Sequence, residues 1–332
     1  MATTTRDVAR EAGVSQSTVS RALNGDPRVA PETRALIQAA AKRLSYLPNS
    51  AARSLITQRT DTIGILIGEI TNPFYPQLVD VLHDEFTLAG FRTVLLNERA
   101  DAGRADELFP QLQGRFVDGI VIANAMLGAT FVDDFHKQGI PVVLLNRDVD
   151  DAHVDRVVSD NTGGGEVAAT TLVELGHRRI GLIGGPANAS TARDRALGFE
   201  RGLARAGLEV ASRRVGEFTH QSGYQWCLEL LREPAPPTAI FAANDVIAFG
   251  VLDAAKRMGI RVPEDLSVIG YDDIEMAGWE LFGLTTVRQP LSQMAKAAAR
   301  MLIERIEGRV VREPARLVFP ANLMRRQTTT YA

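Results

Sequence analysis

Nearly continuous apolar runs, separated by amphipathic stretches, fill the chain from residue 61 onward. The runs are TIGILIGEI, RTVLLNE, GIVIANA, PVVLLNR, RIGLIGG, TAIFAAN and LSVIGYD. Such runs are typical of parallel strands that are covered on both faces. Helical spacing of apolar positions lies between them, over residues 77–89, 164–175, 192–206 and 246–258. The pattern predicts repeated β-α units in doubly wound sheets with right-handed crossovers.

The β-α units fall into two sets, one before about Ser159 and one after it, which predicts two α/β lobes with a cleft between them. In such sheets ligands bind at the carboxyl ends of the strands. Hydrogen-bonding side chains follow six strands: Asn72, Asn97, Asn124, Asn146 with Arg147, Asn244 with Asp245, and Asp272 with Asp273. Each alone is typical of a turn or a helix cap. Six together favour a cleft for a polar small molecule.

The segment before residue 25 has a different pattern, that of two short helices. Gly13 is suited to end the first helix with a positive φ, and Ser15 to cap a second helix from Gln16 to Leu23. The positions expected to face inward are Val8, Ala9, Ala12, Val19, Ala22 and Leu23. These spacings allow the helices to cross steeply, which predicts a helix-turn-helix, and a third helix follows from about Pro31 to Leu44.

The second helix leaves Gln16, Ser17, Ser20 and Arg21 on its outer face. A recognition helix directs its first turn at base edges in the major groove. Gln pairs with adenine and Arg with guanine through two hydrogen bonds, and Ser bonds a base or a phosphate. A three-helix bundle without a ligand is the alternative, but the pattern favours a DNA-binding head.

Charge is distributed unevenly along the chain. Residues 1–60 carry nine Lys/Arg and four Asp/Glu, whereas the remainder carries 28 basic and 36 acidic residues. A basic head on an acidic body indicates a polyanionic partner, although a solvated helical face is the simpler alternative on charge alone.

Several function classes lack their sequence signals. Cys227 is the single cysteine, so a reducing compartment is expected, without internal disulfides. The first residues lack a secretory signal and no run approaches ~18 apolar residues, so we expect a cytoplasmic protein with no membrane contact. The chain has no HExxH, GxxxxGK[ST] or GxSxG motif, and no GxGxxG after the first strand. We therefore expect no metal, cofactor or catalysis. The remote alternative is an α/β enzyme that acts on a sugar, with acid–base chemistry at Asp272 and Asp273.

The GGG run at 163–165 is interpreted as a flexible helix start.

The stretch YLPNSAARSLITQRT, residues 46–60, joins head and body. Pro48 stops regular structure, and residues 50–56 can form only two helical turns, which are marginal alone in water. Such a helix needs the same segment of a second subunit, or DNA, or both. Leu55 can then act as a wedge in the minor groove; a plain linker is the alternative.

Several motifs together resemble the lactose-repressor (LacI/GalR) family. The head TTRDVAREAGVSQSTVSRALNGDPRVAPETRALIQAAAKRLSYLPNSAARSL is similar to its DNA-binding region. ITNPFYPQL, GPANASTARDRALGF, AANDVIAFGVLDAAKRMGIRVPEDLSVIGYDD and LTTVRQP resemble its effector-domain motifs, in order along the chain. The resemblance implies DNA-binding roles for Thr5, Ser15, Gln16, Ser17, Thr18, Ser20, Arg21, Asn24, Asn49, Ala52, Arg53 and Leu55. Residues 49–55 would form a hinge helix.

The resemblance further implies a body with the fold of periplasmic sugar-binding proteins. Its effector contacts would be Asn72, Phe74, Asn124, Asn146, Arg147, Arg195, Phe218, Asn244, Asp272 and Gln289. Phe74 and Phe218 offer flat faces on which a ring can stack. Arg147 either grips a carboxylate or phosphate of the ligand or pairs with Asp148.

The expected domains are residues 1–47 (helix-turn-helix), 48–60 (hinge helix and linker) and 61–332 (effector binding and dimerisation). The first lobe takes about residues 61–159 and 290–319, and the second about 160–289 and 320–332, with crossovers near Asp160, Gln289 and Pro320. No leucine heptad follows the body, which favours a homodimer over a tetramer. The resemblance implies that the helix from Pro76 to Ala89 contributes to its interface.

The expected function is an effector-responsive transcriptional regulator. A dimeric repressor would bind a pseudo-palindromic double-stranded operator. A small sugar-type inducer would release it. The inducer would change the closure of the lobes, and this closure would decide whether the hinge helices pair on DNA. The alternative is a co-repressor-dependent regulator that senses a purine or another end-product metabolite.

Overall fold

The head is a three-helix unit formed by α1 (Thr5–Glu11), α2 (Gln16–Leu23) and α3 (Pro31–Arg43). The computed structural model describes residues 3–23, 26–46, 59–97, 116–150, 153–309 and 313–332, and the chain divides into compact units at residues 1–60 and 61–332. Val8, Val19 and Ile37 are fully buried at the centre of the head. The helix-turn-helix prediction is confirmed.

The turn between α1 and α2 is built as the sequence predicts. Gly13 adopts a φ of +65°, and the Ser15 hydroxyl accepts the backbone N–H of Thr18 at 3.1 Å, which caps α2. The start of α1 has a further cap, because the Asp7 carboxylate accepts hydrogen bonds from the backbone N–H and the hydroxyl of Thr4. These bonds favour the charged carboxylate and lower the pKa of Asp7.

A parallel six-stranded sheet with the strand order β11-β5-β4-β3-β1-β2 forms the first lobe. Its strands are β1 (Thr62–Ile67), β2 (Arg92–Asn97), β3 (Gly119–Ile122), β4 (Val142–Leu145), β5 (Asp155–Ser159) and β11 (Arg316–Phe319). Helices α5 (Phe74–Leu88) and α12 (Leu291–Ile306) pack on one face, and α7 (Phe131–Lys137) packs on the other. Both faces of the central strands are therefore dry, as their continuous apolar runs predict.

The second lobe repeats this architecture with the strand order β12-β10-β9-β8-β6-β7, in which β12 runs antiparallel to β10. Its strands are β6 (Ile180–Gly184), β7 (Ser212–Val215), β8 (Ala239–Ala242), β9 (Ser267–Asp272), β10 (Thr285–Arg288) and β12 (Asn322–Met324). Its helices are α8 (Asn161–Glu174), α9 (Ser190–Arg205), α10 (His220–Leu230) and α11 (Asp245–Arg257), followed by a 3₁₀ turn (Glu275–Gly278). Helices α8 and α9 cover one face, and α10 and α11 cover the other.

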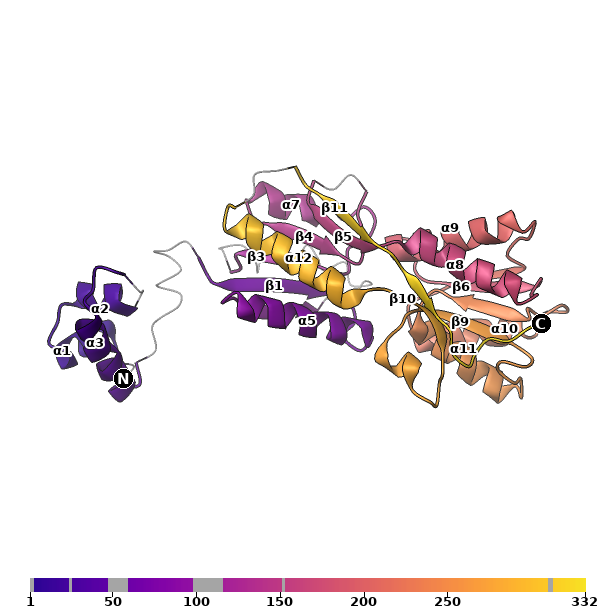
Figure 1. Cartoon of the computed structure of the whole chain (residues 1–332), viewed down its shortest axis with the longest axis horizontal. Helices are drawn as coiled ribbons and strands as arrows, with labels where there is room; N and C mark the ends of the chain where they lie inside the picture. Colours follow the sequence, from indigo (N-terminus) through magenta and orange to yellow (C-terminus); the bar gives the residue numbers. More distant parts are fainter. Residues whose placement is uncertain (1–2, 24–25, 47–58, 98–115, 151–152, 310–312) are drawn as a thin grey trace. The chain divides into compact units, whose positions relative to one another are not determined.

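The chain passes between the two sheets three times. It crosses between β5 and α8, between β10 and α12, and between β11 and β12. Figure 1 shows the result: the late elements α12 and β11, drawn in yellow tones, lie among the purple elements of the first lobe. The doubly wound, two-lobed α/β fold is confirmed.

The run Gly163–Gly165 requires a correction. It lies within the first turns of α8, and Gly164 and Gly165 are buried. A β-carbon on Gly165 would collide with the carbonyl oxygen of Arg195 in α9, and one on Gly164 would collide with the Tyr271 hydroxyl. The run does lie at a helix start, as predicted, but these glycines permit close packing of α8, so the interpretation that this start is flexible is wrong.

None of the helices in the described ranges combines the length and the apolar character that a bilayer crossing requires.

Candidate functional site: an exposed recognition helix and an inter-lobe cleft

Helix α2 buries one side and presents the other. Val19 and Ala22 face the core of the head, while the predicted outer residues are all exposed: Gln16, Ser17, Ser20 and Arg21. The Arg21 guanidinium forms no hydrogen bond or ion pair with the described residues of the head. An exposed basic residue on a capped, rigid helix is a suitable donor for a base edge.

Four of the predicted DNA contacts already have hydrogen-bond partners inside the head: Thr5, Ser15, Ser17 and Thr18. The Ser15 hydroxyl lies 2.8 Å from the Ser17 hydroxyl and 2.7 Å from that of Thr18, in addition to capping α2. The Thr5 hydroxyl lies 2.8 Å from that of Tyr46, which ties α1 to the end of α3. The remaining predicted contacts lie outside the described residues: Asn24, Asn49, Ala52, Arg53 and Leu55.

The acidic side chains of the head are largely neutralised by neighbouring arginines. Asp26 pairs with Arg28 at 2.7 Å, and hydrogen bonds from Arg28 lower the pKa of Asp26 to about 2. Glu11 pairs with Arg43 at 3.1 Å. The excess of basic residues in the head therefore remains as a net positive charge for a polyanion.

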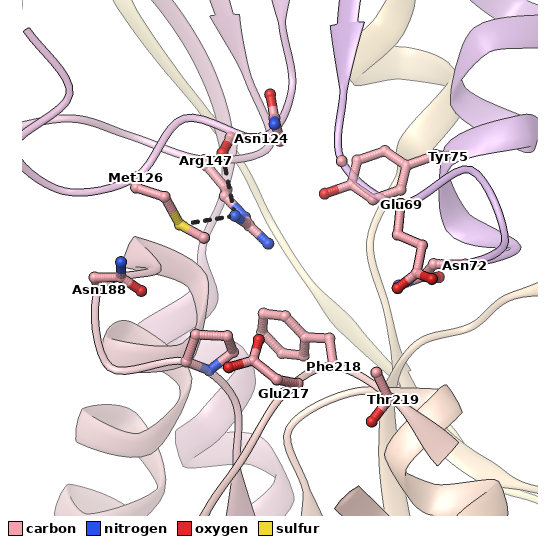
Figure 2. Close-up of a pocket in the computed structure, with 12 residues that line it drawn as sticks. Glu69, Asn72, Tyr75, Asn124, Met126, Arg147, Asn188, Glu217, Phe218 and Thr219 are labelled. Atoms are coloured by element: carbon pink, nitrogen blue, oxygen red, sulfur yellow. Dashed lines mark hydrogen bonds between the residues drawn. The ribbon is translucent and has the colours of Figure 1, made fainter. Parts of the chain in front are cut away.

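The body carries a cleft between its lobes, with two chambers that share several lining residues. The outer chamber encloses about 410 Å³ and is lined by Gly68, Glu69, Asn72, Tyr75, Asn124, Met126, Arg147, Pro186, Asn188, Glu217, Phe218 and Thr219. The inner chamber encloses about 20 Å³ and is lined by Asn72, Phe74, Tyr75, Asn146, Arg147, Thr191, Arg195, Phe218, Asn244 and Asp272. Figure 2 shows the outer chamber, with first-lobe side chains above and second-lobe residues such as Glu217 and Phe218 below.

The structure brings the predicted effector residues together. Nine of the ten line one or both chambers, and Gln289 lies behind them, where its side-chain amide donates to Asp272 Oδ1 at 2.8 Å. They come from both lobes and from strand ends far apart in sequence, because all the parallel strands direct their carboxyl ends at the cleft.

Arg195 and Asp272 form a buried ion pair on the second-lobe wall. Arg195 lies 2.9 Å from Asp272 Oδ1, donates to Asn161 Oδ1 at 2.9 Å and to the Ala243 carbonyl at 2.6 Å, and stacks on Tyr271. Burial raises the pKa of the Asp272 carboxyl, while the Arg195 guanidinium acts to lower it. Because all three nitrogens of Arg195 are engaged, its main role is to hold Asp272 in place at the cleft.

Arg147 is arranged differently on the first-lobe wall. It donates to the Asn124 carbonyl and to the Met126 sulfur, both at 3.1 Å, and its guanidinium lies 5.7 Å from the centre of the Phe218 ring. Figure 2 shows the guanidinium directed into the chamber. The alternative that Arg147 pairs with Asp148 is wrong, because Asp148 is bound by Arg156 and Arg316. Arg147 therefore offers its charge to a ligand.

Several buried polar atoms around the cleft have no hydrogen-bond partner among the described residues. They are Asn124 Oδ1, Asn146 Oδ1, Arg147 Nε and Gln289 Oε1. All four side chains are more than nine-tenths buried. Buried polar atoms in native proteins are normally paired, so such a group of unpaired atoms indicates a ligand or bound water.

Backbone strain is concentrated at the same strand ends. Asn146 adopts a φ of +71° after β4, and Asp272 and Asp273 adopt 109° and 56° at the end of β9. Non-glycine residues in this region are strained, and such strain gathers at ligand sites. It directs the Asn146 and Asp272 side chains to the inner chamber.

Three residues from the predicted strand-end group do not line the cleft. Asn97 is exposed on the edge strand β2 and lines neither chamber. Asp273 pairs with Arg288 and Arg326. Asp245 is fully buried and accepts hydrogen bonds from Thr286 and the Ile274 N–H, and burial raises its pKa well above the usual value.

Most residues that line the outer chamber were not predicted from the sequence. They are Gly68, Glu69, Tyr75, Met126, Pro186, Asn188, Glu217 and Thr219, with Thr191 in the inner chamber. Their available signal was position alone: Glu69 follows β1, Asn188 follows β6 and Glu217 follows β7, at the same edge as the predicted residues. A strand end predicts proximity to the cleft, but loop conformation decides which side chain enters it.

Comparison with known proteins extends over nearly the whole chain. Residues 4–49 match the model of bacterial regulatory proteins of the lacI family, and residues 169–329 match that of a periplasmic binding protein-like domain. The chain is 37% identical over 330 residues to the HTH-type transcriptional regulator CelR of Thermobifida fusca, covering 97% of this chain and 96% of that protein. It is 36% identical over 306 residues to the ribose operon repressor of Escherichia coli strain K12, covering 91% and 93%.

Solved structures agree with these matches. A CelR–cellobiose complex superposes with a TM-score of 0.75 at 35% identity, covering 98% of this chain and 99% of that one. The lac repressor dimer bound to operator and an anti-inducer superposes with a TM-score of 0.89 at 29% identity, covering 99% and 100%. These relatives are transcriptional regulators, which confirms the prediction of a regulator over an enzyme. The chain belongs to the lacI family of bacterial regulatory proteins.

Proposed function

We propose that this protein is a homodimeric transcriptional repressor that binds a pseudo-palindromic operator and is released when a sugar enters the inter-lobe cleft. The observation that carries the proposal is the presence, in one chain, of an exposed recognition face on α2 and a cleft lined by hydrogen-bonding side chains from both lobes. A repressor that acts on chromosomal DNA works in the cytoplasm, and we infer that location.

The cleft chemistry favours a polyhydroxylated effector. Amide oxygens of Asn124 and Asn146 lack donors among the described residues, while Arg147 offers N–H groups beside them. Phe218 adds an aromatic face in the same chamber. Alternating donors and acceptors around an aromatic face suit a sugar ring, whose hydroxyls both donate and accept. The relatives supply independent support, since CelR is known with cellobiose and another relative is a ribose operon repressor.

Dimerisation and operator binding follow the same reasoning. The lac repressor, to which this chain is similar over its whole length, is a dimer on its operator. A two-fold dimer presents two copies of α2 to two half-sites. We propose that residues 49–55 form the hinge helix and that Leu55 enters the minor groove between the half-sites.

The first experiment is a thermal-shift screen of sugars, sugar phosphates, polyols and purines with the full-length protein. Each compound that raises the melting temperature is then tested on binding of the protein to DNA from upstream of its own gene. Release of DNA by a sugar supports the inducer mechanism. Tighter DNA binding in the presence of a purine or other end-product metabolite would favour a co-repressor instead.

The recognition face is tested by Arg21→Ala in a fluorescence anisotropy assay on operator variants. We expect the substitution to relax base preference at one operator position, at a cost of about 1–3 kcal/mol, with no change in effector binding. A uniform loss of affinity on every sequence would assign Arg21 to the phosphate backbone and contradict base reading.

A further inference from the structure

The outer chamber is large compared with the group of residues that the sequence predicts for the effector. The inner chamber, at about 20 Å³, has room for about one water molecule. The outer chamber encloses about 410 Å³, and sites of roughly 300–1,000 Å³ are those that hold drug-sized ligands. The bulk of an effector therefore lies in the outer chamber, and a single hexose would leave much of that space to solvent.

The outer chamber has one aromatic residue on each wall. Tyr75 belongs to α5 of the first lobe, and Phe218 precedes α10 of the second. Figure 2 shows the two rings on different sides of the chamber, with Glu69 near Tyr75 and Glu217 beside Phe218. Phe218 is partly exposed and can cover the apolar face of one sugar unit, whereas Tyr75 is only 5% exposed and closes the opposite wall. A second sugar unit would therefore be held by the polar side chains of the chamber.

The charges of the outer chamber exclude one class of sugar. Its charged lining consists of Glu69, Arg147 and Glu217, and the carboxylates of the two exposed glutamates form no hydrogen bond or ion pair among the described residues. Arg195 and Asp272 neutralise each other deeper in the cleft. The lining therefore carries two carboxylates against one guanidinium, which disfavours a phosphate or carboxylate group on the ligand.

The buried polar atoms give a second, independent indication of a ligand in this chamber. Asn124 and Arg147 line it, are more than nine-tenths buried, and each keeps a polar atom without a partner among the described residues. Carboxylates accept charge-assisted hydrogen bonds from hydroxyl groups. The lining thus offers acceptors at the outer end, on Glu69 and Glu217, and a donor at Arg147.

We propose that the outer chamber is a two-ring subsite for an uncharged disaccharide, in which Glu69 and Glu217 from opposite lobes accept hydrogen bonds from the hydroxyls of the outer ring. One ring lies near Arg147 and Phe218, and its edge reaches the inner chamber. The second ring lies between the two glutamates. Glu69 and Glu217 are then the residues that distinguish a disaccharide from a monosaccharide and a neutral sugar from a phosphorylated one. This proposal rests on the proposed sugar-responsive function.

Isothermal titration calorimetry on the full-length protein tests the proposal, with cellobiose, maltose, lactose and trehalose as neutral disaccharides. Glucose, ribose and glucose 6-phosphate are the comparison ligands. We expect at least one disaccharide to bind about tenfold or more tightly than either monosaccharide, and glucose 6-phosphate not to bind. Glu69→Gln and Glu217→Gln should each weaken that disaccharide by about tenfold, as expected for the loss of a charge-assisted hydrogen bond, and leave monosaccharide binding unchanged.

A matched control and a gain of binding complete the test. Glu209→Gln, at an exposed glutamate outside both chambers, should bind the disaccharide like the unmodified protein. The double variant with Glu69→Gln and Glu217→Gln should gain measurable affinity for glucose 6-phosphate, which a purely structural role of the two carboxylates does not predict. Equal binding of a monosaccharide, no binding of any disaccharide, or unchanged affinities in both glutamate variants would overturn the proposal. Operator binding without sugar, measured by anisotropy, tests the repressor function independently of the disaccharide proposal.

Discussion

The buried pair of Arg195 and Asp272 allows a quantitative prediction about the second lobe. Arg195→Met keeps a side chain of similar length but leaves Asp272, Asn161 and the Ala243 carbonyl without their donor. Breaking a buried ion pair by removing one partner costs about 3–5 kcal/mol, because the remaining charge stays buried. We expect the free energy of unfolding at neutral pH to fall by that amount.

Urea unfolding of the full-length protein measures this loss. The two tryptophans, Trp226 and Trp279, both belong to the second lobe, so tryptophan fluorescence reports on the unfolding of this lobe. Arg201→Met is the matched control, because Arg201 lies exposed on the same helix. The control should change the free energy of unfolding by no more than about 0.5 kcal/mol.

The pH dependence of this loss of unfolding free energy can refute the reasoning. Burial raises the pKa of Asp272, and removing Arg195 takes away the neighbour that lowers it. An acid whose pKa is raised on folding binds more protons in the native state, so its destabilising effect is complete above the folded pKa and shrinks as the pH falls through it. The deficit of Arg195→Met must therefore shrink on the acid side. A loss below about 1 kcal/mol at neutral pH, or a deficit that grows on acidification, would refute the reasoning.

Three further predictions concern other parts of the chain. Burial lowers the pKa of His177 from 6.5, so the unfolded state takes up a proton at a higher pH than the folded state does. The free energy of unfolding should therefore decrease as the pH drops below about 6.5. The melting temperature of His177→Gln should decrease less over the same pH range. Gly165→Ala should lower the free energy of unfolding by about 1–3 kcal/mol through overpacking against α9, whereas Gly184→Ala, whose β-carbon would meet only contacts at 3.6 Å or more, should be nearly neutral in the same urea assay. Leu55→Ala should weaken operator binding in anisotropy and leave effector affinity intact; loss of both would indicate misfolding instead.

The sequence predicts those strands whose two faces are both apolar, and misses those that depend on tertiary partners. β7 and β11 are edge strands with alternating burial, so they lack a continuous apolar run. β5 begins with Asp155, which is buried because Arg305 and the Ala315 N–H bind its carboxylate. β10 begins with Thr285, buried against the Thr328 hydroxyl. A polar residue in the core can be recognised only once its partner is known, and both partners lie far along the chain.

The residues of the site likewise fall into those that the sequence predicts and those that it misses. Strand ends identify Asn124, Asn146 and Arg147, because parallel strands share one functional edge. Adjacent residues nevertheless differ in role: Asn244 caps α11 at the cleft, while Asp245 turns into the core. The loop residues Glu69 and Glu217 enter the chamber through loop conformations that no periodicity encodes. The sequence therefore locates the cleft, whereas the structure determines which side chains can select a ligand.

Polar contacts between the lobes indicate where effector binding acts. Among the described residues they include the Leu127 N–H to the Asn188 carbonyl at 2.8 Å, the Asp148 N–H to the Ser190 hydroxyl at 2.8 Å, and Arg193 to Asp150 at 3.3 Å. Each joins a first-lobe loop to the loop before α9 or to the first turn of α9, close to a cleft residue. An effector that contacts both walls would therefore act on the segments that join the lobes. Arg195 and Asp272 constrain the second-lobe wall through a buried ion pair, whereas among the described residues the Arg147 guanidinium donates hydrogen bonds only to a carbonyl and a sulfur.

The first lobe is therefore the wall that a ligand can rearrange at lower cost. A ligand shifts a conformational equilibrium only by its difference in affinity between the two arrangements. In the proposed two-ring site Glu69 and Glu217, which belong to opposite lobes, supply that difference. The chain enters the first lobe at β1, directly after the unit that ends at Thr60. In the proposed mechanism the head therefore responds to the first lobe, because that lobe is the one that follows it in the chain and has the less constrained wall.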